Sequence, residues 1–187
     1  MEFRLNQSLK TINDCKNKGE YKEREHAYKN EQELLKDLYL IRDSLVHDKD
    51  EKLIDFGLKD LIRLVETFGF FLVNLDIREE STKHSNAIHE IINLLTNKDY
   101  LSLDENNRMI ILESIIRSDF KIDSIYEKLS KETKTVIDVF LTMVKLRKEI
   151  SEDAFGHYII SMTHEASHVL EVLAIARLTG MVRKDDK

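Results

Sequence analysis

The absence of proline constrains this chain more than any other feature of its sequence. None of the 187 residues is proline, and only five are glycine. Proline ends or kinks a helix because it lacks the backbone N–H and clashes with the preceding turn, so its absence favours long helices. The glycines are also too far apart to form a nucleotide-binding loop of the G-x-G-x-x-G or Walker type. We therefore expect a helix-rich protein without a nucleotide site of those kinds.

Apolar residues recur at helical spacing along most of the chain. One helix is predicted to begin at Asn30, because Asn30 and Glu33 form a plausible capping pair, and another start signal runs from Ser102 to Glu105. Gly180 is expected to end the last helix in the left-handed conformation. The apolar positions include Leu34, Leu38, Ile41 and Leu45 in the first helix, Leu58, Leu61, Ile62, Val65 and Phe68 in the second, and Val136, Val139, Met143, Leu146 and Ile150 in a later one.

Two short apolar runs are typical of buried strands instead. They cover about residues 69–78 (GFFLVNLDIR) and about residues 156–163 (GHYIISMT), and each begins with a glycine. Because several helices separate them, they cannot form a hairpin and are predicted to be parallel strands. Two strands cannot close a barrel, so residues 30–187 are expected to be part of a larger α/β structure. Residues 1–29 are mostly polar and are predicted to be a peripheral segment.

Charge, cysteine content and hydropathy exclude several classes of protein. The formal net charge is −6, whereas nucleic-acid binding needs a concentrated excess of Lys and Arg. Cys15 is the single cysteine, and no signal peptide opens the chain, so a reducing cytoplasm is the expected location. No apolar run approaches the roughly 20 residues that span a bilayer, and a membrane protein is therefore not expected.

The string HEASH, residues 164–168, matches the H-E-x-x-H pattern of zinc peptidases. A zinc peptidase also needs a third protein ligand and an open position for water, and no third ligand follows at the usual spacing. The pattern should lie inside a helix, whereas His164 directly follows a predicted strand. We interpret the string as a polar turn between strand and helix, in which Thr163 or Glu165 helps to start the helix.

The segment LDIREESTKH, residues 75–84, places several charged side chains at the carboxyl end of the first predicted strand. In parallel α/β barrels this edge is where active-site groups gather. Arg78 offers a planar, permanently charged group that suits a phosphate or a carboxylate. The alternative is an ion pair between Arg78 and a nearby Asp or Glu that closes the strand end.

Two long stretches resemble phosphoenolpyruvate carboxylase. Residues 65–84, VETFGFFLVNLDIREESTKH, resemble a family motif in which a helix ending in F-G leads into a strand L-D-I-R-Q-E-S-x-x-H. The stretch FGHYIISMTHEASHVLEVLAIARLTG is similar to the family's strand Y-V-I-S-M, followed by a loop and a helix bearing S-D-V-L-x-V. With NEQELLKDLYLIRDSL before the first strand, the matches cover most of residues 28–180 in the family's order. They are more specific than the H-E-x-x-H pattern.

The resemblance implies a mainly α protein with a few parallel strands, forming part of the TIM-like barrel of this family. Its members are cytoplasmic, usually tetrameric enzymes that join bicarbonate to phosphoenolpyruvate with Mg²⁺ or Mn²⁺, giving oxaloacetate and phosphate. The resemblance further implies that Arg78 helps to bind the phosphate of phosphoenolpyruvate. We carry over no catalytic residue and no metal ligand.

Departures from the family pattern limit what is expected of this chain. Glu79 replaces the usual glutamine, and its charge is expected to be offset by a cation or to point away from the phosphate; His168 replaces the usual aspartate. The segments T-x-H-P-T-E, P-L-F-E, G-Y-S-D-S-x-K-D and H-G-R-G-G are missing, including the metal-binding acidic residues. We therefore expect an internal fragment that is inactive alone. The alternative is a stand-alone helical module that binds a phosphorylated metabolite or a protein partner without catalysis.

Overall fold

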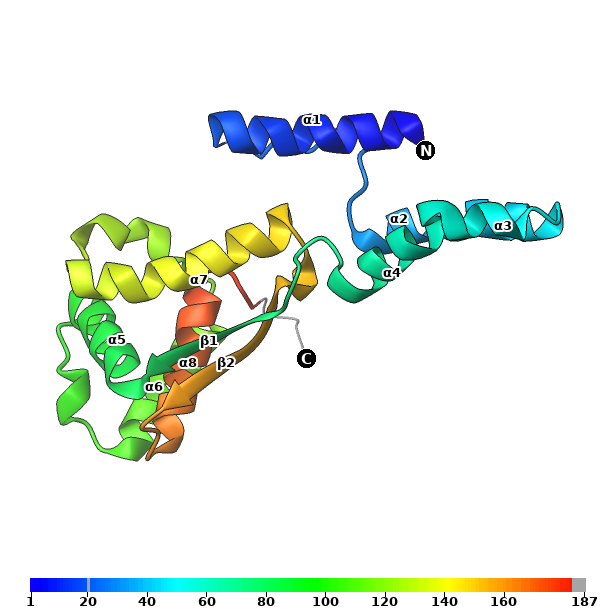
Figure 1. Ribbon diagram of the computed structural model, residues 1–187. Helices are drawn as coiled ribbons and strands as arrows, with labels where there is room; N and C mark the ends of the chain where they lie inside the picture. Colours follow the sequence, from blue (N-terminus) through cyan, green and yellow to red (C-terminus); the bar gives the residue numbers. More distant parts are fainter. Residues whose placement is uncertain (20, 183–187) are drawn as a thin grey trace. The chain divides into compact units, whose positions relative to one another are not determined.

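The structure, a computed structural model, describes residues 1–19 and 21–182 (Figure 1). Residues 183–187, the end of the segment 30–187 predicted above, lie outside the described residues. The chain divides into two compact units. Unit 1 comprises residues 1–74 and 149–154, and unit 2 comprises residues 75–148 and 155–187. Each unit has its own cluster of buried apolar side chains.

Unit 1 is built from helices. They are α1 (Glu2–Lys18), α2 (Glu31–His47), α3 (Glu51–Leu53), the π-helical turn η1 (Ile54–Leu58), α4 (Lys59–Phe68) and the 3-10 turn η5 (Glu152–Ala154). The predicted start of α2 is confirmed, because the side chain of Asn30 accepts a hydrogen bond from the N–H of Glu33 at 3.0 Å. The core of this unit lies mainly between α2 and α4 and consists of Tyr28, Leu34, Leu35, Leu38, Ile62 and Val65.

Helix α1 lies within the segment 1–29, for which the sequence predicted no helix. It buries none of its residues. Two ion pairs tie Arg4 of α1 to Glu33 and Asp37 of α2. The helix ends at Gly19, which has a φ of 68° and donates its N–H to the carbonyl of Cys15 at 2.9 Å. Leu5, Leu9 and Ile12 recur at helical spacing along α1, so the signal was present in the sequence but was masked by the polar residues around it.

The first strand begins later than the predicted residue 69. Gly69 ends α4 with a φ of 51°, and Leu72 has a φ of 65°. These left-handed conformations are incompatible with a continuous strand, so residues 69–74 form a turn despite their apolar sequence. The strand itself, β1, runs over Leu75–Glu80, and the second strand, β2, over Phe155–Ser161.

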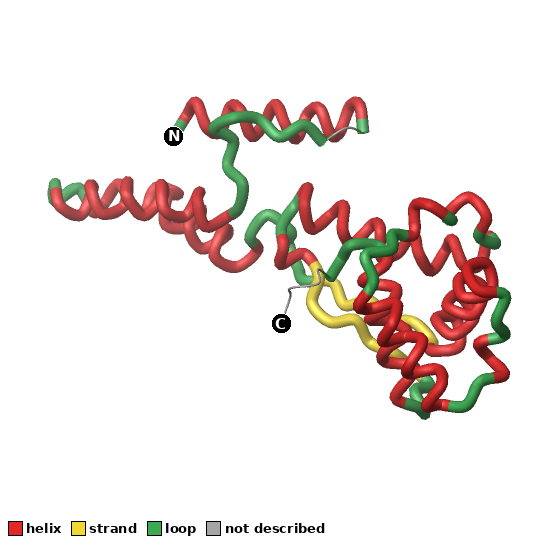
Figure 2. The backbone as a smooth tube through the Cα atoms, turned by 180° about the vertical axis from the view of Figure 1, so that it is seen from behind, coloured by secondary structure: helices red, strands yellow, loops and turns green. Residues whose placement is uncertain are grey.

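Unit 2 combines the two strands with helices. After β1 come α5 (Ser81–Thr96), the 3-10 turn η2 (Tyr100–Ser102), α6 (Glu105–Arg117), the 3-10 turns η3 (Ile122–Ser124) and η4 (Tyr126–Lys128), α7 (Lys131–Glu149), β2 and α8 (Ala166–Leu178). β1 and β2 pair in parallel, with Arg78 opposite Ile159 and Glu80 opposite Ser161. Figure 2 shows the two strands side by side among the helices of this unit. The predicted class, mainly helical with a few parallel strands, is confirmed.

The core of unit 2 lies between the sheet and helices α5 to α8. Its fully buried members include Ile88, Ile91, Tyr100, Leu112, Ile137, Phe140, Ile175 and Leu178. Helix α8 also buries Arg177, whose guanidinium donates to the carbonyls of Ile116 and Ser118 at 3.1 and 3.2 Å. The charge is therefore hydrogen-bonded to the end of α6, which makes its burial tolerable.

Candidate functional site

The candidate site lies on the exposed face of the two-stranded sheet. Side chains alternate along a strand, so Asp76, Arg78 and Glu80 share one face of β1, and all three are exposed. The register with β2 shifts by one residue between Leu75 and Ile77. At this irregularity the N–H of His157 donates to Oδ1 of Asp76 at 2.8 Å. That hydrogen bond holds the pKa of Asp76 below its ordinary value, with smaller contributions from the His157 ring and from Arg78.

Arg78 has an exposed guanidinium on this face. Within residues 1–19 and 21–182 the structure gives it no hydrogen bond and no ion pair. The ion pair weighed above as an alternative is therefore not formed with any described residue. A guanidinium in this situation keeps its five donors available for an oxyanion.

Glu79 does not share the face of Arg78. It follows Arg78 in the strand and projects from the opposite face, where Nζ of Lys83 lies 2.8 Å from its Oε1. Lys83 thereby lowers the pKa of Glu79. The negative charge that departs from the family pattern is both directed away from Arg78 and offset by a cation. The sequence analysis offered these two outcomes as alternatives, and both occur.

Hydrogen bonds fasten the carboxyl ends of the strands to each other. Oγ of Ser81, the first residue of α5, donates to the carbonyl of Met162 at 2.8 Å. Oγ of Ser161 donates to the carbonyl of Glu79 at 3.4 Å. Met162 has a φ of 57°, which ends β2 and turns the chain toward α8. The ends of β1 and β2 are thus fixed beside each other close to Arg78.

Only the first two residues of the HEASH string lie in the predicted turn before α8, and its last three residues begin the helix. Glu165 is the N-cap residue and α8 begins at Ala166, so His164 lies before the helix and His168 within it. The N–H of His164 points at Nδ1 of His168 at 3.3 Å. In the described part of the chain, no group of three His, Cys, Asp or Glu side chains is arranged to hold a metal ion.

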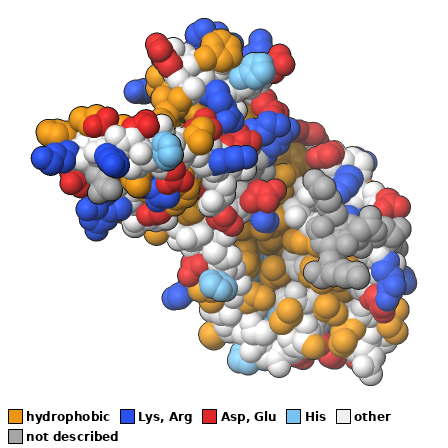
Figure 3. Space-filling model, turned by 90° about the vertical axis from the view of Figure 1, so that its right-hand side faces the viewer, with side chains coloured by type: hydrophobic (Ala, Val, Ile, Leu, Met, Phe, Trp, Pro, Cys, Tyr) orange, Lys and Arg blue, Asp and Glu red, His pale blue; other side chains and the backbone are white. Residues whose placement is uncertain are grey.

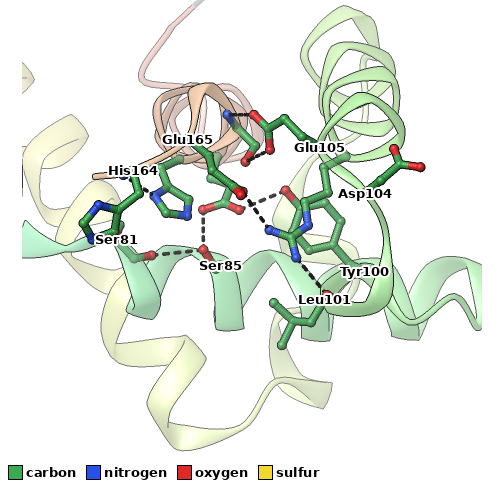
Figure 4. Close-up of polar contacts among 12 residues, drawn as sticks. Ser81, Ser85, Tyr100, Leu101, Asp104, Glu105, His164 and Glu165 are labelled. Carbon is green, nitrogen blue, oxygen red and sulfur yellow. Dashed lines mark hydrogen bonds and ion pairs between the residues drawn. The ribbon is translucent and has the colours of Figure 1, made fainter. Parts of the chain in front are cut away.

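The start of α8 is held by residues of α6 (Figure 4). Glu105 accepts hydrogen bonds from the N–H and the hydroxyl of Ser167, both at 2.7 Å. A carboxylate at a helix N-terminus satisfies free N–H groups and interacts favourably with the helix dipole. Arg108 forms a second link, with 3.3 Å between Nη1 and Oε2 of Glu165.

A buried polar network beneath this helix was not predicted from the sequence. Glu171 of α8 is fully buried, and its carboxylate accepts hydrogen bonds from Ser85 at 2.7 Å and from Tyr100 at 2.9 Å. Figure 4 labels these two donors. Burial raises the pKa of Glu171, which the two hydrogen bonds partly counteract. The only available signal was a single glutamate within the apolar run VLEVLAIARL.

A second buried pair connects α5 to the sheet. Nε2 of His84 lies 2.8 Å from the hydroxyl of Tyr158 in β2, and His84 is fully buried. Burial lowers the pKa of His84 to about 4, so the imidazole is neutral near pH 7. Tyr158 packs in turn on Phe140, with 5.0 Å between ring centroids. These contacts hold the protected face of the sheet while Arg78 occupies the exposed face.

No helix within the described residues is long and apolar enough to cross a membrane.

A protein-family model described as phosphoenolpyruvate carboxylase matches residues 1–187. Phosphoenolpyruvate carboxylase of Prochlorococcus marinus subsp. pastoris is 35% identical over 176 residues, 94% of this chain and 17% of the relative. The Synechococcus sp. enzyme of the same name is 38% identical over 149 residues, 79% of this chain and 14% of the relative. Phosphoenolpyruvate carboxylase 1 of Chlamydomonas reinhardtii is 32% identical over 155 residues, which are 83% of this chain and 16% of the relative. The chain thus spans about a sixth of the length of these relatives.

Proposed function

This chain belongs to the phosphoenolpyruvate carboxylase family, and we propose on that basis that it is part of an enzyme that carboxylates phosphoenolpyruvate. The reaction joins phosphoenolpyruvate and bicarbonate and yields oxaloacetate and phosphate. We further propose that β1 and β2 are neighbouring strands of a TIM-like barrel. Their parallel pairing and the helices between them support this proposal.

Arg78 is the residue of this chain for which we propose a role in substrate binding. Phosphoryl transfer requires cationic groups around the transferring phosphate, because negative charge redistributes over its oxygens. The exposed guanidinium of Arg78 can donate two parallel hydrogen bonds to such oxygens. Glu79 lies on the opposite face of β1 in contact with Lys83, whereas Asp76 and Glu80 share the face of Arg78 without forming an ion pair with it. Arg78 is therefore proposed to bind the phosphate of phosphoenolpyruvate.

The divalent metal of the proposed enzyme does not fit the residues described here. No three His, Cys, Asp or Glu side chains of residues 1–19 and 21–182 come together as a metal site. Mg²⁺ and Mn²⁺ need several oxygen ligands, usually carboxylates. We propose that other residues of a longer protein hold the metal and that the 187-residue chain alone is inactive.

The surface of the chain supports a larger assembly. Large apolar side chains are exposed in both units, and Figure 3 shows one face on which they gather. Leu40, Phe56, Leu72 and Ile110 are 64–84% exposed. Apolar surface on this scale is normally covered by further protein. It supports the proposal that this chain forms one part of a larger enzyme, for which the family membership suggests a tetramer in the cytoplasm.

A ligand titration of the 187-residue chain tests the role of Arg78. We expect phosphoenolpyruvate to shift the amide resonances of residues 77–80, and the Arg78→Gln variant to lose these shifts. Arg63→Gln is the matched control, because Arg63 is an exposed arginine of α4 in unit 1. Shifts at β1 that persist in Arg78→Gln, or that vanish in Arg63→Gln as well, would contradict the assignment.

A coupled assay tests the expected inactivity. The chain is incubated with phosphoenolpyruvate, bicarbonate and Mg²⁺, and oxaloacetate is followed by its reduction with malate dehydrogenase and NADH. We expect no turnover above the rate without protein. Turnover that depends on the chain and is reduced by Arg78→Gln would refute the inactivity and support the assignment of Arg78.

A further inference from the structure

Unit 1 contains a cavity of about 380 Å³ that the proposed function does not use. It lies between α1, residues 21–29 and the start of α2, and Phe70 and Ile150 complete its wall. Most of its lining is apolar and consists of Leu5, Leu9, Ile12, Ala27, Leu34, Phe70 and Ile150. Apolar cavities of this size with a few polar groups are typical of sites for small molecules.

Several polar groups of the wall are already bound within the protein. Oγ of Ser8 donates to the carbonyl of Arg4 at 3.1 Å and accepts from the N–H of Tyr28 at 2.9 Å. The hydroxyl of Tyr28 donates to Asp37 at 2.6 Å. Burial, together with this hydrogen bond to a carboxylate, raises the pKa of Tyr28 to about 12. These groups hold α1 and residues 21–29 in place, so they form the frame of the cavity.

The hydroxyl of Tyr21 is a hydrogen-bond donor at the wall that has no acceptor among residues 1–19 and 21–182. Burial and the charge of Glu23 raise the pKa of Tyr21, so its hydroxyl stays protonated and donates. Nε of Arg24 also makes no hydrogen bond there, but it has almost no accessible surface, so a ligand in the cavity does not reach it. A ligand oxygen would satisfy the donor of Tyr21.

The ion pairs of the wall leave little excess charge for a ligand. Arg24 is paired with Asp14, and Nζ of Lys29 lies 3.5 Å from Oε1 of Glu23. Glu149 also lines the cavity, so the charges of Arg24 and Lys29 are balanced by those of Glu23 and Glu149. The match to a ligand therefore depends on shape and on the donor of Tyr21 rather than on attraction between opposite charges.

We propose that this cavity binds a small apolar ring compound that carries a carboxylate or carbonyl oxygen. The ring contacts the apolar side chains of α1, and the oxygen accepts a hydrogen bond from the hydroxyl of Tyr21. This site is formed entirely by unit 1. It is separate from Arg78, which belongs to unit 2.

Two naphthalene compounds with opposite polar groups test the proposal. 2-Naphthoate presents an oxygen acceptor, and 2-(aminomethyl)naphthalene presents a cationic donor on the same ring. Binding to the full 187-residue chain is followed by naphthalene fluorescence, excited at wavelengths longer than the protein absorbs. The net charge of −6 favours the amine in any non-specific binding. We expect 2-naphthoate to bind at least fivefold more tightly.

Variants locate the site. Tyr21→Phe keeps the ring and removes one donor, and we expect it to weaken 2-naphthoate binding about tenfold. Ile12→Trp fills the cavity from α1 and is expected to abolish saturable binding. Phe56→Ala removes an exposed aromatic ring outside the cavity and should leave the affinity unchanged. Circular dichroism checks that each variant remains helical.

Four results would overturn the proposal. They are absence of saturable 2-naphthoate binding up to millimolar concentration, equal affinity for the two compounds, full affinity in Tyr21→Phe, and loss of affinity in Phe56→Ala. If Ile12→Trp does not fold, the comparison of the two compounds and the Tyr21→Phe variant still decides. None of these results depends on whether Arg78 binds phosphoenolpyruvate.

Discussion

Removing one hydroxyl from the buried network around Glu171 should destabilise unit 2 by an amount that depends on pH. The Tyr100→Phe substitution keeps the buried ring and deletes the 2.9 Å hydrogen bond to the carboxylate. A hydrogen bond to a charged group contributes about 1.5–3 kcal/mol, and one between neutral groups about 0.5–1.5 kcal/mol. We therefore expect a loss of about 2 kcal/mol when Glu171 is ionised and about 1 kcal/mol when it is protonated.

The sign of the pH dependence follows from the raised pKa of Glu171. Burial raises its pKa in the folded protein above the unfolded value. The folded state then binds the proton more tightly, so the contribution of this group is complete below the unfolded pKa and is lost as the pH rises through the folded pKa. The hydroxyl of Tyr100 lowers the folded pKa, so its removal raises that pKa further and increases the loss at high pH.

Urea unfolding measured by circular dichroism at pH 4.5 and pH 8 tests this expectation. These conditions avoid the isoelectric point of about 5.7. Tyr126→Phe is the control, because the hydroxyl of Tyr126 donates to the exposed Asp138, and its loss should be smaller and similar at both pH values. In the Glu171→Gln background, Tyr100→Phe should lose its pH dependence. An equal loss at pH 4.5 and pH 8 in the native background would refute the reasoning.

Two further predictions concern stability. The pKa of His84 is lowered to about 4, so its contribution to stability is complete above the unfolded value of about 6.5 and is lost as the pH falls toward 4. In His84→Gln the urea midpoint should therefore fall less between pH 7.5 and pH 5 than in the native protein. An equally large fall of the midpoint in the variant would count against this expectation. Phe140→Ala should lower the free energy of unfolding by about 3–5 kcal/mol, because Phe140 is 1% exposed in the core of unit 2. Phe56→Ala should lower it by less than about 0.5 kcal/mol, because Phe56 is 84% exposed. Similar decreases of the urea midpoint in the two variants would contradict the assignment of the core.

The local signals in the sequence predicted the elements better than their ends. The capping pair of Asn30 and Glu33 predicted the start of α2, and Gly180 has the expected left-handed conformation with a φ of 78°. Helix α6 begins later than the signal at Ser102, because Asp104 is the residue that caps it. The distance along the chain between the two apolar runs correctly predicted parallel pairing. Apolar composition could not show the turn after Gly69, because that turn depends on backbone torsions.

The candidate site was predictable only where it rests on a strand. The alternation of side chains puts Arg78 and Glu79 on opposite faces, but the contact of Glu79 with Lys83 needs the turn from β1 into α5. Glu171 collects hydrogen bonds from Ser85 and from Tyr100, which lie far from it in the sequence. No spacing rule connects such positions, so the network becomes visible only when the helices are packed.

The parallel pairing of β1 and β2 also has a consequence for how the chain folds. The hydrogen bond from Ser81 to Met162 joins residues 81 positions apart. Closing so long a loop costs conformational entropy, and contacts between the strands offset this cost only after the loop has closed. Helices form between neighbouring residues and do not carry this cost. We expect α5, α6 and α7 to form early and the sheet to form late. During synthesis, β1 cannot pair with β2 until the ribosome has released β2, so this part of the surroundings of Arg78 is among the last parts of unit 2 to be completed.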